Sequence, residues 1–478
     1  MDKVKECEGD YRLFIDDSDS LIVVLHLTYS KVLKIDKKTG EITEDDQSII
    51  SNLNISNVYK PHAILGIITI NKLSYLLYVD KYEIVGSINS SDIFKVIKTN
   101  FIPLFNKDYT RSGTTNDIEI QNLKNLLSLG FYYSFKYDLS TSRQKKQQNL
   151  SININNSNSI KDISNENCME NIVTKYFWNL SLNKKLFEAK VNKVWSIVCI
   201  FGYVNIQKLV LSGETVQLSI ISRRSCNNPG IYNYAKGISD SGHVANYVET
   251  EIIISIKQKI YSFVILRGSA PVFFDEDLSN SQILIKKNAN LTSQAFIKHL
   301  QEIQQNFKFI MMMNLMNEKN LEEDCISTSF KTQFEINEIN NCKYHQFDLY
   351  NNCSNDNFAK LDKYIHDNLL KILVNFNCYR EESKDCKDSK YSKDCQDSKD
   401  CKDSKDSKEI NKEIKEILVG KDSNSSEDTK NEKNKKESHT YEQKGVFRVN
   451  CLDSLDRTNI FQSRICWQIL LIIVSISF

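Results

Sequence analysis

The sequence predicts a mixed α/β fold of the α+β kind, with a β-rich first half and an α/β second half. Three observations lead to this prediction. Segments rich in β-branched and aromatic residues dominate the first half. Helical and strand patterns alternate after about residue 290. A Cys-x5-Arg segment, Cys451 to Arg457, lies between a short predicted strand and a predicted helix. A loop in that position joins a strand of the sheet to a helix that covers it.

The first half carries short apolar runs bounded by polar clusters, which indicate strands. They cover residues 21–27, 64–70, 74–79 and 131–137. The apolar stretch 63–79 is broken by Asn71, Lys72 and Ser74, so we interpret it as two strands joined by a turn and not as a membrane span. Residues 144–159 are polar and rich in Asn, and we interpret them as a mobile loop.

Strand patterns continue in the second half and then alternate with helices. Strands are predicted at 195–201, 209–211, 216–221, 251–256 and 260–267. A helix from Thr292 or Ser293 places Phe296, Leu300 and Ile303 on one face. A buried strand at 307–315 follows, whose methionines 311–313 are expected to fill the core, and then a helix at 358–374. A strand at 446–449 and a helix from Thr458 enclose the Cys-x5-Arg loop.

Length and composition limit the class of protein. The 478 residues are enough for two or three domains, and 41% of them are hydrophobic. The 62 basic and 61 acidic side chains give a net charge of +1, which argues against a dedicated nucleic-acid binder. The 13 cysteines form no C-x-x-C pair and no zinc-site spacing, so a reduced, cytosolic setting fits best. The polar N-terminus has no apolar core of a signal peptide.

Residues 381–440 differ from the rest of the chain. They include the near-repeat SKDCKDSKYSKDCQDSKDCKDSKDSKE, which has almost no apolar residues. Such a segment cannot bury enough surface to offset its ordering entropy, so we expect a disordered insert. The final ten residues, ILLIIVSISF, are apolar but shorter than the roughly twenty that span a bilayer, so no membrane anchor is expected.

The Cys-x5-Arg loop suits phosphoryl-transfer chemistry. A loop that closes onto a helix N-terminus directs backbone N–H groups inward and forms a cradle for a phosphate dianion. The same positive field is expected to lower the pKa of Cys451 toward the thiolate. Arg457 can hold two phosphate oxygens, and Thr458 can donate its hydroxyl to the thiolate. Cys451 would then attack phosphorus, water would release phosphate, and Asp453 or Asp456 would protonate the leaving oxygen. No metal or cofactor is needed for these steps.

The surrounding sequence RVNCLDSLDRTNIFQS resembles the signature loop of the Sac-domain phosphoinositide phosphatases, commonly R-T-N-C-x-D-C-L-D-R-T-N. Further blocks resemble that family in its own order from about residue 64 to 463. They are ILGIITINKLSYLLYV, GFYYSFKYDLSTSRQ, YFWN, SRRS, HVANYVETE, LRGSAPVFF, MNLMNEK and YHQFDLYNNC. Arg267 and Gly268, within the LRGSAPVFF block, are expected to stabilise the site and not to touch substrate.

The resemblance implies a fold, a set of site residues and a substrate. The fold is a β-rich N-terminal subdomain, residues 1–185, packed on an α/β catalytic subdomain, residues 186–478, with Sac homology recognisable from about residue 120. Cys451, Asp453 and Arg457 are expected to be catalytic, with Asp453 favoured as the acid and Asp456 as the residue that orients the guanidinium. The remaining residues of the motif are expected to bind substrate. They are Leu452, Ser454, Leu455, Asp456, Thr458, Asn459 and Arg448.

The resemblance also implies a phosphoinositide in a membrane as the partner, typically phosphatidylinositol 4-phosphate. The expected location is the cytoplasmic face of the endoplasmic reticulum, Golgi or endosomes. The departures are Ser454 and Val449 where the family commonly has Cys and Thr, and a catalytic subdomain that we expect to be truncated. Two alternatives stay open: a protein tyrosine or dual-specificity phosphatase, whose loops usually carry glycine and follow a histidine, and a catalytically impaired lipid-binding scaffold.

Overall fold

The computed structural model describes residues 4–6, 11–16, 20–104, 113–156, 174–211, 213–229, 236–277, 282–353, 357–382 and 441–477. Contacts within the chain divide it into two compact units. The first contains Met1–Thr141, Ser157–Ile206 and Ile221–Cys226. The second contains Ser142–Asn156, Gln207–Ile220 and Asn227–Phe478. The division at residue 185 that we predict from the resemblance stays a prediction.

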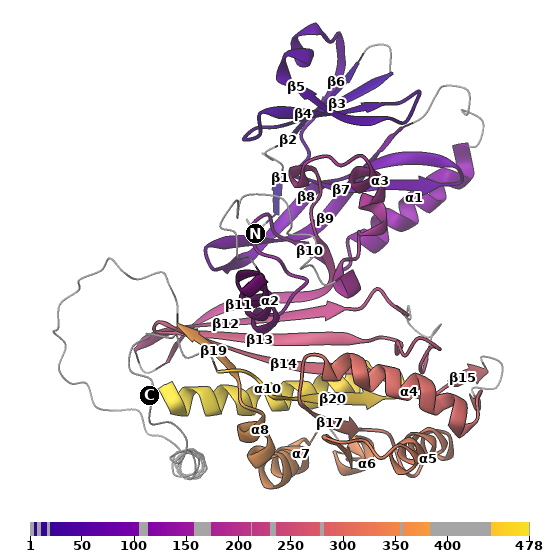
Figure 1. Ribbon diagram of the computed structural model, residues 1–478, viewed down its shortest axis with the longest axis vertical. Coiled ribbons are helices and arrows are strands. Elements are labelled where there is room, and N and C mark those ends of the chain that lie inside the picture. Colours follow the sequence, from indigo (N-terminus) through magenta and orange to yellow (C-terminus); the bar gives the residue numbers. More distant parts are fainter. Residues whose placement is uncertain are drawn as a thin grey trace, which may run out of the picture. The chain divides into compact units, whose positions relative to one another are not determined.

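The first unit is built from two antiparallel sheets (Figure 1). The smaller sheet has the order β5-β4-β3-β2-β6. Its strands are β2 Tyr11–Asp16, β3 Leu21–His26, β4 Lys31–Asp36, β5 Ile42–Asp46 and β6 Ile55–Tyr59. The larger sheet runs β1-β8-β9-β10-β11, with β7 on β8. Its strands are β1 Val4–Glu6, β7 Ala63–Ile70, β8 Leu73–Ile88, β9 Ser91–Pro103, β10 Phe131–Tyr133 and β11 Cys199–Leu211.

Alternating side chains of the two sheets meet in one core of the first unit. Leu13, Val24 and Leu33 from the small sheet share this core with Leu76 of the larger sheet and with Trp195. The indole N–H of Trp195 donates to Glu44 at 2.8 Å, so the buried ring has its hydrogen-bond partner. Period-two alternation therefore gives each sheet one apolar face, as β-branched strands predict.

The second unit is a mixed sheet with helices on both faces (Figure 1). Its central strands run β13-β14-β20-β17-β18, with β19 on β14. The β20 pairings with β14 and β17 and the β17–β18 pairing are parallel, and β14 is antiparallel to β13 and β19. The strands are β13 Val248–Ile256, β14 Lys259–Ser269, β17 Phe309–Asn314, β18 Cys342–Gln346, β19 Tyr379–Glu382 and β20 Gly445–Cys451. A further strand, β12 Glu214–Arg224, has its first residues in the second unit and its last in the first. A separate hairpin pairs β15 Phe274–Asp277 with β16 Gln282–Ile285.

Alternation along β20 assigns helices to the two faces. Phe447, Val449 and Cys451 lie in the core that α7, α8 and α10 cover. Arg448 lies between Phe447 and Val449, so its side chain points to the opposite face of the sheet, where it donates to His299 of α4. The helices are α1 Gly113–Leu127, α2 Arg143–Asn156, α3 Lys184–Glu188, α4 Ala289–Gln304, α5 Leu321–Ile336, α6 Leu349–Asn352, α7 Ala359–Tyr364, α8 Leu370–Phe376 and α10 Asp456–Ser477.

The predicted fold class is confirmed: an antiparallel N-terminal sheet and a large mixed sheet with helices. The predicted turn between residues 70 and 74 is also confirmed. Asn71 and Lys72 have φ of +46° and +70°, the left-handed pair of a tight hairpin turn. Methionines 311–313 are buried in the core as expected.

Several predicted elements are wrong in kind or in extent. The run 144–159 was expected to be a loop, but its described part lies in α2. The strand predicted at 195–201 is a 3-10 turn Lys193–Trp195 followed by β11, which also absorbs the strand predicted at 209–211. The strand predicted at 131–137 ends at Tyr133. The helix predicted at 358–374 contains a π-helical turn, Ile365–Leu369, between α7 and α8.

Two expectations about the second unit's periphery also change. Residues 381 and 382 belong to β19, so the predicted insert does not begin at 381, and its residues 383–440 lie outside the described chain. The C-terminal apolar residues are not a ten-residue segment but the end of the 22-residue helix α10. By length and a mean hydropathy of 1.6, α10 is able to cross a membrane, so the expectation of no possible anchor is wrong. Core helices pass the same test, and Ile465, Ile469 and Ile473 of α10 are buried.

Candidate active site

Cys451 ends the central parallel strand of the second unit. Its strand β20 lies between β14 and β17, and Ser269 and Asn314 end those strands beside it. All seven residues of β20 are buried, and α10 begins five residues after the cysteine. The carboxyl ends of parallel strands and a following helix N-terminus are a common place for anion sites. The predicted strand–loop–helix arrangement of the loop is therefore present.

Three side chains outside the loop hold its backbone carbonyls. Ser269 Oγ donates to Leu452 O at 3.2 Å, Asn246 Nδ2 donates to Asp453 O at 3.0 Å, and Arg267 Nη1 donates to Ser454 O at 2.7 Å. In a trans peptide the C=O and the next N–H point in opposite directions. Fixing three successive carbonyls therefore also fixes the directions of the N–H groups that follow them.

Ser454 sits at the bend of the loop. Its φ of +60° is in the left-handed region, which a non-glycine residue adopts only when its surroundings fix it. Left-handed residues within such loops turn successive N–H groups into a concave anion-binding nest. Its buried hydroxyl has no hydrogen-bond partner among the described residues.

Cys451 contacts Asp453 directly. The thiol donates to Asp453 Oδ1 at 3.3 Å, and the same oxygen accepts from Leu455 N at 3.2 Å. Burial raises the pKa of Cys451, and the Asp453 carboxylate raises it further, while Arg457 and the Leu455 N–H lower it. The expectation of a lowered pKa is therefore wrong for this arrangement, because the loop brings a carboxylate as well as N–H groups to the sulfur.

Arg457 is held by a residue that the motif does not contain. Its Nη1 and Nη2 donate to the two carboxylate oxygens of Glu323 in α5 at 2.7 and 2.8 Å. Burial lowers the pKa of the guanidinium, but the hydrogen bonds of Glu323 and the charges of Cys451 and Asp453 raise it overall, so Arg457 stays charged. The partner that orients the guanidinium is therefore Glu323, and not Asp456 as expected.

Arg448 lies behind the loop and not at its surface. Its fully buried guanidinium donates to the carbonyls of Gly268 and Ser269 at 3.0 and 2.6 Å, and to His299 Nε2 at 3.2 Å. Burial lowers its pKa to about 10, and the charge of Cys451 opposes that shift. These contacts favour a supporting role for Arg448 over the substrate contact that the motif predicted.

The remaining predicted residues divide between loop and helix. Leu452 and Leu455 are half-buried in the loop, and Asp456 and Asn459 are exposed in the first turn of α10. The Thr458 hydroxyl donates to Leu455 O at 3.1 Å. The expected bond from Thr458 to the thiolate is therefore replaced by a bond that closes the loop onto the helix.

Two residues near the loop were not predicted. The sequence around Glu323 contains a recognisable helix-capping pattern. Asn320 caps α5 and Glu323 occupies its third helical position, as in a capping box. That pattern predicts a cap, and not a partner for Arg457. Nothing in the sequence pointed to Lys236. Burial lowers the pKa of this lysine, while the charges of Asp453 and Asp275 raise it, so Lys236 is a cation close enough to Asp453 to interact with it. Among the described residues, no group of three or more His, Cys, Asp or Glu is arranged to hold a metal ion.

The class of the protein follows from a family comparison. A family model described as the SacI homology domain matches residues 62–354, more than half of the chain. The chain therefore belongs to the SacI homology domain family, the family of the Sac-domain phosphoinositide phosphatases, which confirms the resemblance.

Individual relatives are distant. Phosphatidylinositol-3-phosphatase SAC1-A of Danio rerio is 24% identical over 451 residues, covering 90% of this chain and 64% of the relative. Synaptojanin-1 of Homo sapiens is 26% identical over 305 residues, 61% of this chain and 18% of the relative. Phosphoinositide phosphatase SAC5 of Arabidopsis thaliana is 29% identical over 289 residues, 57% of this chain and 35% of the relative. The chain thus spans less than two thirds of each of these relatives.

Proposed function

We propose that the chain hydrolyses the phosphomonoester of phosphatidylinositol phosphates through a phosphocysteine intermediate, with phosphatidylinositol 4-phosphate as the preferred substrate. The observation that carries the proposal is the Cys451–Arg457 loop between β20 and α10, whose carbonyls are held by Ser269, Asn246 and Arg267. Family membership supports the lipid class. The Danio rerio relative is named a 3-phosphatase, so the 3-phosphate is the direct competitor.

The first step transfers the phosphoryl group to sulfur. Asp453 accepts the Cys451 proton along their hydrogen bond, and the thiolate attacks phosphorus. The S–P bond forms as the P–O bond to the inositol breaks, and Asp453 passes the same proton to the departing oxygen. Arg457 and the loop N–H groups offset the charge on the transferred phosphoryl oxygens. Five N–H donors are present on a guanidinium, and Glu323 takes two, so three remain for phosphate.

The second step returns the enzyme to its starting form. Asp453, now a carboxylate, takes a proton from water, whose oxygen attacks phosphorus. The P–S bond breaks, phosphate leaves, and the Cys451 thiolate recovers its proton from Asp453. Leu452, Ser454 and Asp456 contribute backbone donors in both steps, and the Leu455 N–H positions the Asp453 carboxylate. Thr458 and Asn459 keep the first turn of α10 against the loop.

We place this activity at the cytoplasmic face of the endoplasmic reticulum, Golgi or endosomal membranes, as the family implies. Within the chain, α10 is the described helix able to span a bilayer. Its Phe461, Ile465 and Ile469 pack in the core with Val449 and Cys451.

The test is phosphate release by the full chain from vesicles that each contain one phosphoinositide, with phosphotyrosine peptide as a parallel substrate. Cys451→Ser should abolish release, and Cys325→Ser, which changes an exposed cysteine, should not. Acid quenching should trap a phosphoenzyme in the parent chain and none in Cys451→Ser. Release from the peptide and not from lipid would identify a protein phosphatase. Lipid binding without release would identify a scaffold, and either result overturns the proposal.

A further inference from the structure

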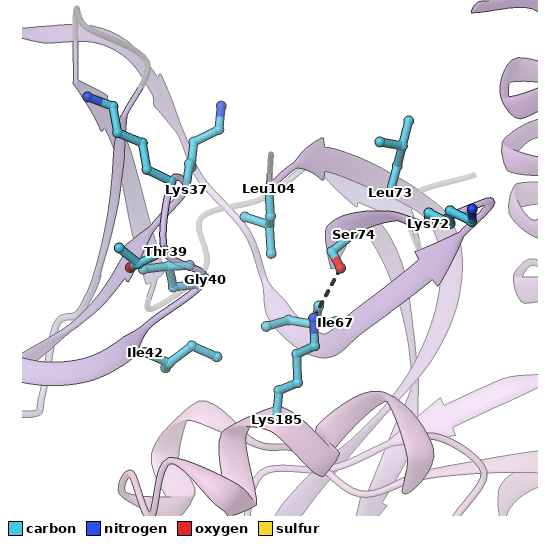
Figure 2. Close-up of a pocket in the computed structure, with 12 residues that line it drawn as sticks. Lys37, Thr39, Gly40, Ile42, Ile67, Lys72, Leu73, Ser74, Leu104 and Lys185 are labelled. Atoms are coloured by element: carbon cyan, nitrogen blue, oxygen red, sulfur yellow. Dashed lines mark hydrogen bonds between the residues drawn. The ribbon is translucent and has the colours of Figure 1, made fainter. Parts of the chain in front are cut away.

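The first unit contains a basic pocket of about 260 Å³ (Figure 2). It lies between the turn that follows β4, the β7–β8 hairpin and α3. The lining residues are Ile35, Lys37, Lys38, Thr39, Gly40, Ile42, Ile67, Lys72, Leu73, Ser74, Leu104 and Lys185.

The pocket collects positive charge without a lining counter-charge. Four of its residues are lysines, and among the described residues none of those lining it is acidic. Lys72 and Lys185 make no ion pair with any carboxylate in the described part of the chain, whereas the charge of Lys38 helps to lower the pKa of the neighbouring Asp36. Lys185 reaches up from α3 and donates to Ser74 Oγ at 3.0 Å, as the dashed line in Figure 2 shows. Gathered like charges raise the local potential for anions.

Three of the four lysines, Lys38, Lys72 and Lys185, are positioned by different elements of the fold. Lys72 occupies the left-handed second position of the β7–β8 turn. Lys38 follows Asp36, whose Oδ1 accepts from the backbone N–H groups of Lys38 and Thr39 at 2.7 and 2.9 Å. These hydrogen bonds hold the turn and lower the pKa of Asp36.

Lys185 lies on α3, which the fully buried Leu186 anchors in the core. The three Cα positions are thus set before any ligand arrives, and only the side chains remain to be ordered.

We propose that this pocket binds a small anion carrying two or more phosphate groups, at a site separate from the Cys451 loop. All lining residues belong to the first unit, whereas the loop belongs to the second. Lysines act as point charges for phosphate, and Ser74 and Thr39 add hydroxyls. The apolar residues Ile67 and Leu104 suit the carbon skeleton of a ring. An inositol phosphate has this chemistry, either free or as a lipid headgroup.

The experiment is calorimetric titration of the full chain with inositol 1,4-bisphosphate in a Cys451→Ser background, which prevents turnover. We expect two sites, and Lys72→Gln/Lys185→Gln should remove one of them or weaken it by about tenfold or more. Lys60→Gln/Lys184→Gln is the matched control: Lys184 precedes Lys185 on α3 and pairs with Glu188, and neither control residue lines the pocket. The control should leave both sites unchanged.

Equal binding by the two double variants would overturn the proposal. If the Cys451 loop binds no inositol phosphate, one binding site should still be present and should still depend on Lys72 and Lys185. Failure of the proposed phosphatase function is therefore distinguishable from failure of the proposed pocket. Thermal unfolding checks that the variants are folded, and Lys72→Gln alone, at an exposed turn, serves if the double variant is not. Flotation with phosphatidylcholine vesicles that contain phosphatidylinositol 4,5-bisphosphate separates the sources. Lysine-dependent flotation identifies a lipid headgroup, and lysine-dependent titration without it identifies a soluble ligand.

Discussion

The contact between Glu323 and Arg457 gives the sharpest test of how the loop works. Glu323 Oε2 accepts from Arg457 Nη1 at 2.7 Å and from Asn317 N at 2.6 Å, and Oε1 accepts from Arg457 Nη2 at 2.8 Å. Glu323→Gln keeps the size of the side chain but replaces one oxygen with an NH2 group. The amide oxygen can stay at the position with two donors. The NH2 group then faces Arg457 Nη2, donor against donor, and the guanidinium loses one edge of its support.

The expected loss follows from one charge-assisted hydrogen bond. Such a bond contributes about 1.5–3 kcal/mol in a partly buried site. If the guanidinium must hold the same orientation in the transition state, that energy is lost from catalysis. At 1.36 kcal/mol for each factor of ten, kcat/KM for phosphatidylinositol 4-phosphate should fall by about 10- to 150-fold. The loss should be mostly in kcat, because phosphate charge is held most tightly when it is transferred.

The assay is steady-state phosphate release from vesicles, with Glu322→Gln as the control in the same first turn of α5. The control removes the same charge from the same helix terminus but touches no residue of the loop, so kcat/KM should change less than about twofold. Thermal unfolding of both variants shows whether α5 stays docked. Equal rates for Glu323→Gln and the parent chain would refute the reasoning and show that Arg457 is oriented by the loop alone.

Three further predictions concern protonation and packing. Asp453→Asn should move the pH midpoint of Cys451 alkylation by iodoacetamide to lower pH, since the carboxylate raises the pKa of that thiol; an unchanged midpoint would contradict this. Burial lowers the pKa of His62 to about 4, so between about pH 6.5 and 4 the His62 side chain takes up a proton in the unfolded chain and not in the folded one. The free energy of unfolding therefore falls by about 1.4 kcal/mol per pH unit as the pH drops through that window. His62→Gln should therefore show a shallower acid loss in unfolding free energy, and parallel curves would exclude the effect. In Gly445→Ala, the new Cβ would lie 2.0 Å from the Phe376 ring, so unfolding free energy should fall by about 1–3 kcal/mol, and Phe376→Leu should recover part of it in a double-mutant cycle.

The sequence predicted best those elements whose own residues carry the pattern. The strands β7, β13 and β14 coincide closely with their β-branched runs, and α4 follows the spacing of Phe296, Leu300 and Ile303. An element that buries one face has apolar residues at the period of that element, so the hydrophobic period in the sequence predicts the element that forms.

Elements without an apolar face escaped prediction. Helix α2, RQKKQQNLSININN, is almost entirely polar, and its hydrophobic spacing predicts nothing. Its first turn is instead held by specific contacts: Arg143 N donates to Glu251 Oε1 at 2.8 Å, and Gln144 Nε2 donates to Gln443 O at 3.1 Å. Gln443 lies 299 positions later in the chain, and no local pattern reports a contact over that distance.

The same limit applies to the candidate site. Cys451, Asp453 and Arg457 were found because the motif is local, and their roles remain predictions. Glu323 and Asn246, which hold Arg457 and the Asp453 carbonyl, lie 134 and 207 positions away from their partners. Burial is the largest cause of the raised pKa of Cys451, and it depends on how the second unit packs around the loop, so the motif alone gave the wrong direction.

That raised pKa also bears on the proposed proton path. Two guanidiniums interact with the Cys451 charge: Arg457 lowers the pKa of the thiol, and the charge of Cys451 in turn raises the pKa of Arg448. Burial and the Asp453 carboxylate oppose them. When Asp453 accepts the thiol proton, its own charge disappears, and the two guanidiniums then act on the thiolate against burial alone. A single proton transfer thus forms the Cys451 thiolate and protonates Asp453, the proposed general acid. The net charge of the Cys451–Asp453 pair does not change in this transfer.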